Sequence, residues 1–195
     1  MLARVNAIGS RTADVLIANS HAGAAHVSSL GYPTGRLIVV PNGIDTDRFR
    51  PDPERRRRQR ADWAINADQR IIGLAARLDP MKDHANFVRA AKVAFHNGID
   101  LATSSSAFGE GFSNAIGEAM ACGTPCVVTD VGDSARIVGT TGRVVAPRDP
   151  EALGQAWDVM LAATQSLNAL ACRRRIVESF SLEALCRNTE RALGL

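Results

Sequence analysis

The chain has 195 residues, of which 46% are hydrophobic and 22% charged, and a formal net charge of +3. This composition predicts a folded protein with a hydrophobic core and excludes a compositionally disordered chain. The small net charge argues against a nucleic-acid partner. The four cysteines have no zinc-ligand spacing, and without a secretory leader they indicate a reducing, cytoplasmic compartment. No apolar run reaches the length of a membrane span.

The first part of the chain predicts two short strands joined by a helix. Residues 13–19 and 36–40 are apolar runs typical of buried strands. Ser20 is a suitable N-cap for the helix between them, which is expected to end near residues 30–31. The Pro-Asn-Gly sequence at 41–43 is a strong turn signal and ends the second strand.

A basic helix is expected next, at about residues 54–64. Prolines at 51 and 53 frame an extended link into it, and five of the seven residues 54–60 are arginines. We interpret this run as a solvated helix face. Contact with a phosphate or with anionic lipid is the alternative interpretation.

Beyond the basic helix, strands and helices alternate regularly. Residues 70–76 have almost no polar interruption, as in a strand of a parallel sheet that is covered on both faces. Further strands are expected at 99–103, 125–129 and 142–145. Helices are expected at 83–95, 113–122, 149–163, 166–179 and 181–192. The alternation predicts an α/β fold with a Rossmann-like, doubly wound parallel sheet and a helical C-terminus.

Two glutamates lie eight residues apart near the middle of this region, Glu110 in a glycine-rich loop and Glu118 inside the following helix. Ligands of open α/β sheets bind at the carboxyl ends of strands, where a helix start such as Ser113 offers unpaired N–H groups. Gly109 and Gly111 let the backbone approach a ligand closely, and Glu118 is expected to lean back toward the same pocket. Two carboxylates and exposed amides fit a sugar nucleotide. Either glutamate alone has the alternative role of a capping or solvated residue.

The residues around these glutamates resemble the signature of a known family. The sequences EGFSN at 110–114 and EAMACGTP at 118–125 are similar to the glutamate, seven residues, glutamate (EX7E) motif of the retaining glycosyltransferases of family 4, also called glycosyl transferases group 1, which have the GT-B fold. The sequence PNGID at 41–45 resembles the hinge between the two domains of that fold. The sequence RLDPMK at 77–82 resembles the basic pair after the first strand of the second domain.

The resemblance implies roles for individual residues. Three are expected to be catalytic, because they orient the donor sugar or neutralise the departing diphosphate: Glu110, Arg77 and Lys82. Four are expected to bind the donor through backbone amides or, for the last, through the ribose hydroxyls: Gly111, Phe112, Ser113 and Glu118. Family members generally work without a metal, so no metal site and no cofactor besides the donor co-substrate are expected. Surface charge is the alternative role of the two basic residues.

The resemblance covers most of the chain but does not supply two complete domains. Residues 1–45 are expected to be a remnant of the N-terminal GT-B domain with the hinge, and residues 46–195 the C-terminal, nucleotide-sugar-binding domain. Between about 97 and 99 the family pattern indicates an internal deletion of at least one strand–helix unit. Direct passage from strand 70–76 to strand 99–103 then requires a helix on the opposite face, a left-handed connection or a rearranged sheet.

The sequence therefore predicts a glycosyltransferase that moves a sugar from a nucleotide-diphosphate sugar, with retention of configuration. The acceptor is expected to be a saccharide, a lipid-linked sugar or another small molecule. Peripheral association of a cytoplasmic protein with the membrane stays open. Two alternatives are a non-catalytic fragment that keeps a diphosphate cradle and an interaction module that pairs through exposed strand edges.

Overall fold

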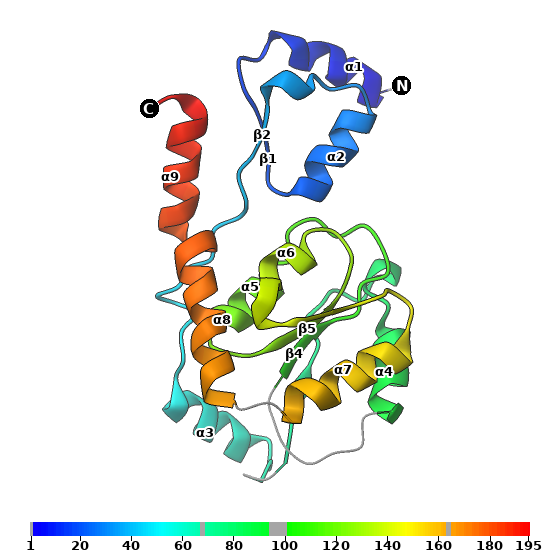
Figure 1. Ribbon diagram of the computed structural model, residues 1–195, viewed down its shortest axis with the longest axis vertical. Helices are drawn as coiled ribbons and strands as arrows, with labels where there is room; N and C mark the ends of the chain where they lie inside the picture. The colour runs from blue at the N-terminus through cyan, green and yellow to red at the C-terminus, as the bar shows by residue number, and fades with distance from the viewer. Residues whose placement is uncertain (1, 67–68, 94–100, 163–164) are drawn as a thin grey trace.

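The computed structural model of the chain describes residues 2–66, 69–93, 101–162 and 165–195. These residues form two parallel sheets, one of two strands in the order β1-β2 and one of four strands in the order β3-β4-β5-β6. In Figure 1 the smaller sheet and its helices lie above the larger sheet, and both chain ends lie at the top. The predicted α/β fold with parallel strands and a helical C-terminus is confirmed.

The smaller sheet belongs to an N-terminal unit, residues 2–40. Its elements are α1 (Leu2–Gly9), a 3-10 turn (Ser10–Thr12), β1 (Leu16–Ala18), α2 (His21–Ser29), a second 3-10 turn (Thr34–Arg36) and β2 (Leu37–Val39). Ser20 caps α2 as predicted, because its hydroxyl accepts a hydrogen bond from the N–H of Gly23 at 3.0 Å. Helix α1 was not predicted, since its sequence has neither an acidic first turn nor a basic last turn.

The larger sheet and its helices follow the predicted alternation closely. The elements are α3 (Pro53–Asp62), β3 (Ile72–Gly73), a 3-10 turn (Pro80–Lys82), α4 (His84–Val93), β4 (Leu101–Ser104), α5 (Asn114–Ala121), β5 (Cys126–Thr129), α6 (Ser134–Val138), a further 3-10 turn (Gly139–Thr141), β6 (Arg143–Val145), α7 (Pro150–Ala162), α8 (Gln165–Phe180) and α9 (Leu182–Leu193). Helix α6, between β5 and β6, is an addition to the predicted elements.

Two apolar cores cover the two faces of the larger sheet. Alternate residues of β5 point to opposite faces, so that Cys126 and Val128 belong to one core and Val127 to the other. The first core is closed by side chains of α5, α6 and α8, and the second by side chains of α4 and α7 (Figure 1). In the second core the indole N–H of Trp157 donates to Thr103 Oγ1 at 3.3 Å, and the ring packs edge-on against Phe87.

The crossovers of the larger sheet differ in hand. The chain moves one position in the same direction from β3 to β4, from β4 to β5 and from β5 to β6. Helix α4 lies on the opposite face from α5 and α6, so the β3-α4-β4 crossover has the opposite hand to the other two. Because nearly all parallel crossovers have the same, right hand, this difference between α4 and the other two helices is unusual.

Strand β3 is shorter than predicted and lies at the edge of the sheet. Only Ile72 and Gly73 pair with β4, opposite Leu101 and Ala102. The residues that follow, 74–77, line a cavity instead of extending the ladder. The expected deletion at about 97–99 lies outside the described residues and stays a prediction.

The segment between the two units is held by the C-terminal helices. Ile44 forms a parallel β-bridge with Ser181. The N–H of Ile44 donates to the carbonyl of Phe180 at 2.7 Å, and the carbonyl of Ile44 accepts the N–H of Leu182 at 3.2 Å. The junction of α8 and α9 therefore anchors the chain that joins the two units. The side chain of Ile44 is only 3% exposed and belongs to the first core.

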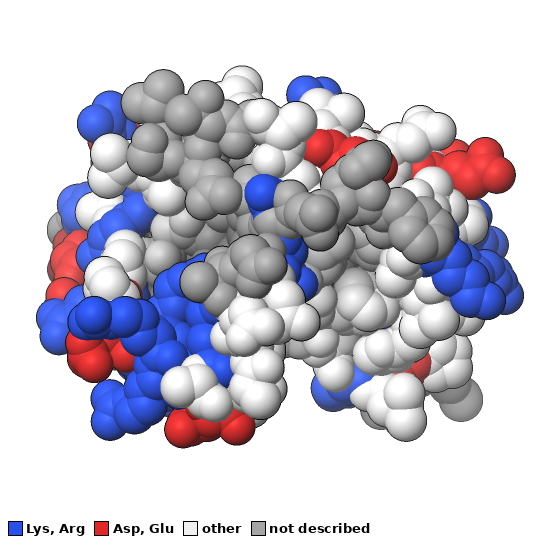
Figure 2. All heavy atoms as spheres, turned by 90° about the horizontal axis from the view of Figure 1, so that it is seen from below, with Lys and Arg blue, Asp and Glu red and all other residues white. Residues whose placement is uncertain are grey.

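The basic helix is confirmed as α3, capped by Asp52, whose carboxylate accepts the N–H of Arg55 at 2.8 Å. No residue of this helix is buried. Figure 2 shows Lys and Arg side chains gathered over the part of the lower face that α3 forms. Within the ranges that the structure describes, no helix has the length and apolar character needed to cross a membrane.

Candidate functional site

A cavity of about 470 Å³ opens at the carboxyl ends of β3 and β4, where α5 begins. Its lining comes from the segment after β3, from Lys82, from the end of β4, from the loop before α5 and from the first turn of α5. The carboxyl edge of a parallel sheet is the place where such folds bind ligands. The predicted position of the site is therefore the position of this cavity.

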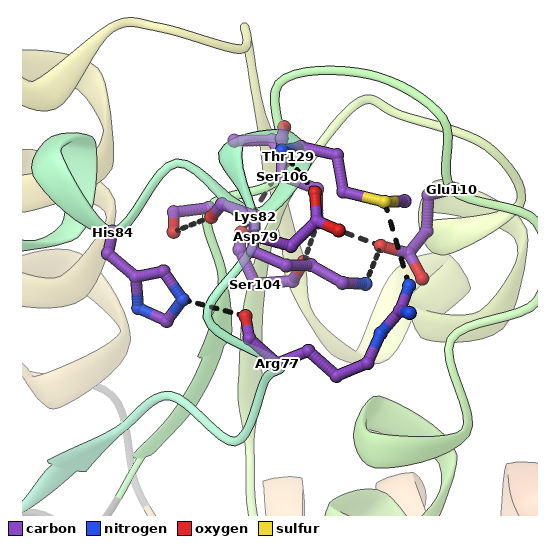
Figure 3. A network of polar contacts seen from close by, with 10 residues as sticks. Arg77, Asp79, Lys82, His84, Ser104, Ser106, Glu110 and Thr129 are labelled. Carbon is purple, nitrogen blue, oxygen red and sulfur yellow. Dashed lines mark hydrogen bonds and ion pairs between the residues drawn. The ribbon is translucent and has the colours of Figure 1, made fainter.

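Lys82 and Glu110 form an ion pair inside this cavity, between Lys82 Nζ and Glu110 Oε2. Both side chains are largely buried, with exposed fractions of 15% and 8%. Figure 3 shows the two side chains pointing toward each other from separate segments. A buried carboxylate and a buried ammonium each require a partner, so the pair satisfies both in the absence of a ligand.

Serines after β4 hold the carboxylate of this pair in place. The hydroxyl of Ser106 donates to Glu110 Oε2 at 2.8 Å. The carbonyl of Ser106 accepts a hydrogen bond from Thr129 Oγ1 at 2.7 Å, which fixes the loop to the end of β5. Ser104 and Ser106 hydroxyls lie 3.2 Å apart. Glu110 thus has a fixed orientation that does not depend on Lys82 alone.

The lysine is placed by a short capped turn. The carboxylate of Asp79 accepts the N–H of Met81 at 2.9 Å at the start of the 3-10 turn that ends at Lys82. The hydroxyl of Ser105 donates to the carbonyl of Lys82 at 2.8 Å. Asp83, the next residue, has a φ of +46°, which turns the chain sharply into α4. The ammonium group therefore projects from a rigid backbone.

Arg77 lines the same cavity and remains exposed. Its Nη2 atom lies 3.8 Å from Met81 Sδ, and its carbonyl contacts His84 Nε2 at 2.9 Å. Figure 3 shows its guanidinium reaching toward Glu110. His84 begins α4, within the helix predicted at 83–95, and its ring contacts the backbone of Arg77. The two predicted cations thus share one cavity.

The glycine-rich loop packs on the lysine turn. The N–H of Ala107 donates to the carbonyl of Met81 at 2.8 Å. Gly109 has a φ of +70°, and a Cβ at this position would lie 3.3 Å from Met81 Cε. Glycine is needed here for its backbone conformation. The loop and the turn therefore bring Glu110 and Lys82 together.

Helix α5 begins at the cavity with open amide groups. Ser113 is its N-cap, but the Ser113 side chain makes no capping hydrogen bond. Ser113, Asn114, Ala115 and Ile116 all line the cavity. The first turn of a helix has unpaired N–H groups and a positive dipole end, which together favour an anion. The amide of Asn42, from the turn between the units, donates to Asn114 Oδ1 at 3.0 Å.

The structure brings together most of the predicted site residues. Five of the seven line the cavity: Arg77, Lys82, Glu110, Phe112 and Ser113. The ring of Phe112 belongs to the first core, 5.5 Å from the ring of Phe180, so its backbone is the part available to a ligand. Gly111 lies in the same loop, where a Cβ would meet Ser20 Oγ at 3.1 Å.

Glu118 is not among the residues that line this cavity. It is half-buried on α5, near Cys122, whose pKa is raised by burial and to a smaller extent by the Glu118 charge. Ala115 and Ala119, on the neighbouring side of the helix, line an apolar hollow of about 380 Å³ beside β3. The two hollows share lining residues, among them Ala115 and Thr103. A contact between Glu118 and ribose stays a prediction.

The sequence interpretation missed the residues that support the pair. Three consecutive serines, at 104–106, stand at the end of the buried strand β4, at the carboxyl edge of the sheet, and this was the signal available for them. Thr129 ends the adjacent strand, and Asp79 precedes a proline as a turn cap. Among the described residues, no three His, Cys, Asp or Glu side chains gather as metal ligands.

Solved structures with the same arrangement define the class of the fold. A crystal structure of Anabaena HepE in complex with UDP-glucose matches 99% of this chain and 67% of its own length, with a TM-score of 0.86 at 18% identity. Sucrose-phosphate synthase from Thermosynechococcus elongatus matches 98% of this chain and 60% of its own, with a TM-score of 0.77 at 20% identity. The C-terminal domain of a glycosyl transferase group 1 protein from Francisella tularensis matches 72% of this chain over its full length, with a TM-score of 0.59 at 19% identity. The fold is that of the GT-B glycosyltransferases.

Family models then give the family. The model described as Glycosyl transferases group 1 matches residues 58–163, more than half of the chain, and the model described as Glycosyltransferase Family 4 matches residues 2–48. The chain belongs to the group 1 glycosyltransferase family. The resemblance recognised in the EX7E motif is therefore confirmed at the level of the family.

Curated relatives include the D-inositol 3-phosphate glycosyltransferases of Mycobacterium tuberculosis and Mycobacterium bovis. They are 30% identical to this chain over 199 aligned positions, which take in 76% of this chain and 41% of the relative. The chain thus spans about two fifths of the length of these relatives. The matched 76% of this 195-residue chain accounts for only about three quarters of the 199 aligned positions. At the remaining positions, roughly 50, the relative has a residue and this chain has none.

Proposed function

We propose that this chain binds a nucleotide-diphosphate sugar in the cavity around Lys82 and Glu110 and transfers the sugar to an acceptor with retention of configuration. The observation that carries the proposal is the Lys82–Glu110 pair beside the open start of α5. Each part has a counterpart in such a donor: cation and amides bind phosphate, and the carboxylate binds hydroxyls. Because the fold neighbour HepE was crystallised with UDP-glucose, UDP-glucose is the first donor to test.

The diphosphate takes the place of Glu110 as the partner of Lys82. Its entry gives the Lys82 ammonium and the Arg77 guanidinium an anion to contact, together with the amides of the first turn of α5. Negative charge accumulates on the departing diphosphate during transfer, and fixed positive groups lower the barrier for that step. In this scheme the two cations replace a metal ion, and the reaction does not need one.

Glu110 then orients the sugar. When Lys82 contacts phosphate, the Glu110 carboxylate is free to accept sugar hydroxyls, while Ser106 keeps it in place through the bond at 2.8 Å. Attack on the same face that the leaving group departs from retains the anomeric configuration. Glu110 acts here as a positioning acceptor and not as a covalent nucleophile.

Glu118 completes the donor site by binding the ribose. It is four residues after Asn114, so the two lie on the same side of α5, and Asn114 lines the cavity. A donor whose diphosphate sits at the start of α5 can reach Glu118 by lying along this side of the helix. The nucleoside end is then more exposed to solvent than the sugar end.

The chain corresponds to a reduced form of the two-domain enzyme. We assign residues 1–45 to the N-terminal domain and hinge and residues 46–195 to the donor-binding domain, with strand–helix units absent near 97–99. The roughly 50 unmatched positions against the mycobacterial relatives and the opposite hand of the α4 crossover support this assignment. Acceptors to test are D-inositol 3-phosphate, the substrate named for the relatives, simple saccharides and lipid-linked sugars, with a cytoplasmic location and vesicle binding examined alongside.

Calorimetric titration with UDP and a turnover assay with UDP-glucose test the function together. Binding with release of UDP in the presence of an acceptor or water, unaffected by EDTA, supports the metal-independent enzyme. Binding without turnover supports the second candidate, a non-catalytic chain that keeps the diphosphate cradle; the roughly 50 positions inside the alignment at which this chain has no residue favour this candidate. Absence of binding to UDP and to other nucleoside diphosphates contradicts both and leaves an interaction module, which size-exclusion chromatography with partner chains examines.

A further inference from the structure

Asp133 connects the N-terminal unit to the loop that carries Glu110. Its carboxylate accepts two hydrogen bonds from the start of α2, from the N–H of His21 at 2.7 Å and from the N–H of Ala22 at 2.9 Å. Asp133 is only 4% exposed, and it follows β5 in the other unit. These bonds join segments that are more than 100 residues apart in the sequence.

The bonds complete the cap of α2. Gly23 and Ala24 donate their N–H groups to the hydroxyl and the carbonyl of Ser20, at 3.0 and 2.9 Å. The remaining two amides of the first turn, those of His21 and Ala22, have no acceptor within the helix. Asp133 supplies that acceptor as a charged group at the positive end of the helix dipole. The first turn of α2 therefore holds the N-terminal unit against Asp133, a contact that we call the seating of α2.

The backbone of Asp133 contacts the glycine-rich loop on its other side. The N–H of Asp133 donates to the carbonyl of Gly111 at 3.0 Å. Gly132 has a φ of +63°, and a Cβ at this position would overlap the carbonyl of Glu110. Ser20 lies against Gly111 from the side of α2. The Glu110–Gly111 backbone is thus enclosed between the start of α2 and the turn at Asp133.

We propose that Asp133 is a positioning residue through which the seating of α2 fixes the loop that carries Glu110. Its side chain faces a small hollow of about 180 Å³ shared with His21 and Phe112, and it does not line the donor cavity. It therefore acts through the Gly111 carbonyl and does not touch the donor. Coupling of this kind is reciprocal, so a ligand that orders the loop also strengthens the contact between α2 and Asp133. This effect of a ligand rests on the proposed donor site, whereas the effect of the seating of α2 on the loop does not.

Two variants weaken the contact between Asp133 and α2 from opposite sides. Asp133→Asn replaces the charged acceptor, and Asp130→Asn is its control, because Asp130 is an exposed carboxylate three residues earlier. His21→Pro removes one donor N–H at the first helical position, where proline is well accepted. Ser20 is extended, with φ −159° and ψ 154°, as a residue before proline prefers. His21→Ala is the matched control, since it loses the imidazole and keeps the N–H.

Amide exchange measured by NMR on the ligand-free protein tests the seating without any nucleotide. We expect exchange of the residue-133 amide, which bonds to Gly111, to become about tenfold faster in Asp133→Asn and in His21→Pro. Exchange at this amide should match the wild type in Asp130→Asn and His21→Ala. Unchanged exchange of the residue-133 amide in His21→Pro overturns the proposal, because loss of a bond between α2 and Asp133 would then have no effect on the loop. If Asp133→Asn fails to fold, the two His21 variants decide the question.

Titration with UDP tests the reciprocal part. In the wild type, UDP should slow exchange of the Ala22 amide by about fivefold or more. In His21→Pro, the factor by which UDP slows this exchange should be less than half of the wild-type factor. Protection of equal size in both proteins contradicts the coupling. If UDP does not bind the wild type, the proposed donor site fails, while the ligand-free exchange experiment still decides whether Asp133 fixes the loop.

Discussion

The ammonium group of Lys82 pairs with the carboxylate of Glu110 in the cavity at the start of α5, where neither side chain is more than 15% exposed. The pair lies between two segments, the turn after β3 and the loop after β4, that are 28 residues apart. It joins the cation and the carboxylate that a nucleotide-sugar donor would separate.

Removal of the lysine should destabilise the protein. In Lys82→Met, Glu110 keeps its bond from Ser106 but loses its counter-charge, and a buried carboxylate without one is costly. We expect the free energy of unfolding in urea to fall by about 1–3 kcal/mol. Lys92→Met, at an exposed position on α4, should change it by less than about 0.5 kcal/mol.

A double variant separates the pair from the individual residues. Lys82→Met combined with Glu110→Gln removes both charges, so it should recover part of the stability lost in the lysine variant alone. Additive losses in the double variant would show that the two groups do not interact in solution.

Replacement of the glutamate should separate binding from turnover. Glu110→Gln keeps the size of the side chain and releases Lys82 to contact the diphosphate. We therefore expect UDP to bind at least as tightly as in the wild type, whereas any sugar transfer or donor hydrolysis falls by about 100-fold or more. Glu151→Gln, an exposed residue of α7, is the control and should leave both quantities unchanged. Weaker UDP binding together with full turnover would contradict the roles given to the pair.

A single methyl group at Gly132 should displace the glycine-rich loop. The φ of +63° is unfavourable for alanine, and the new Cβ would overlap the carbonyl of Glu110. Gly132→Ala should lower the free energy of unfolding by about 1–3 kcal/mol and weaken UDP binding. In Gly35→Ala the new Cβ meets nothing within 4 Å and φ is not positive, so both measurements should stay close to the wild type.

Stability should fall at alkaline pH because of the buried thiols. Burial raises the pKa of Cys126 well above the ordinary value of 9.0 and also raises the pKa of Cys172. Both thiols hold their protons more tightly in the folded chain than in the unfolded chain, so their contribution to stability is complete below pH 9.0 and decreases above it. Each thiol should add at most about 1.4 kcal/mol per pH unit to the decrease. Urea unfolding between pH 8 and 10 should show a smaller slope in Cys126→Ala, and Cys186→Ser, which changes an exposed thiol, should keep the full slope.

The sequence predicted most of the fold and the place of the site, because the signals for both are local. The strand before Ser104 and the helix after Ser113 follow from apolar periodicity and turn residues. Parallel strands then bring every loop at their carboxyl ends to one edge. The EX7E motif placed Glu110, and the RLDPMK sequence at 77–82 placed Lys82, at the edge where the two side chains share one cavity.

Other features depend on contacts that are distant in the sequence. The length of β3 is set by its pairing with β4, so the strand predicted at 70–76 has only two residues in the structure. The role of Asp133 depends on α2, more than 100 residues away, and no local signal in the sequence indicates it. Glu118 does not line the cavity, although Asn114, one turn earlier on the same side of α5, does, so its contact with ribose stays a prediction.

Calorimetric titration with UDP and with uridine, on the wild type and on a variant that combines Arg77→Ala with Lys82→Met, tests the central claim most directly. If the cavity is a diphosphate site, UDP binds the wild type, uridine binds at least about tenfold more weakly, and the variant loses the difference between them. If uridine binds as tightly as UDP, or if the variant binds UDP as the wild type does, the two cations and the start of α5 do not form a diphosphate site.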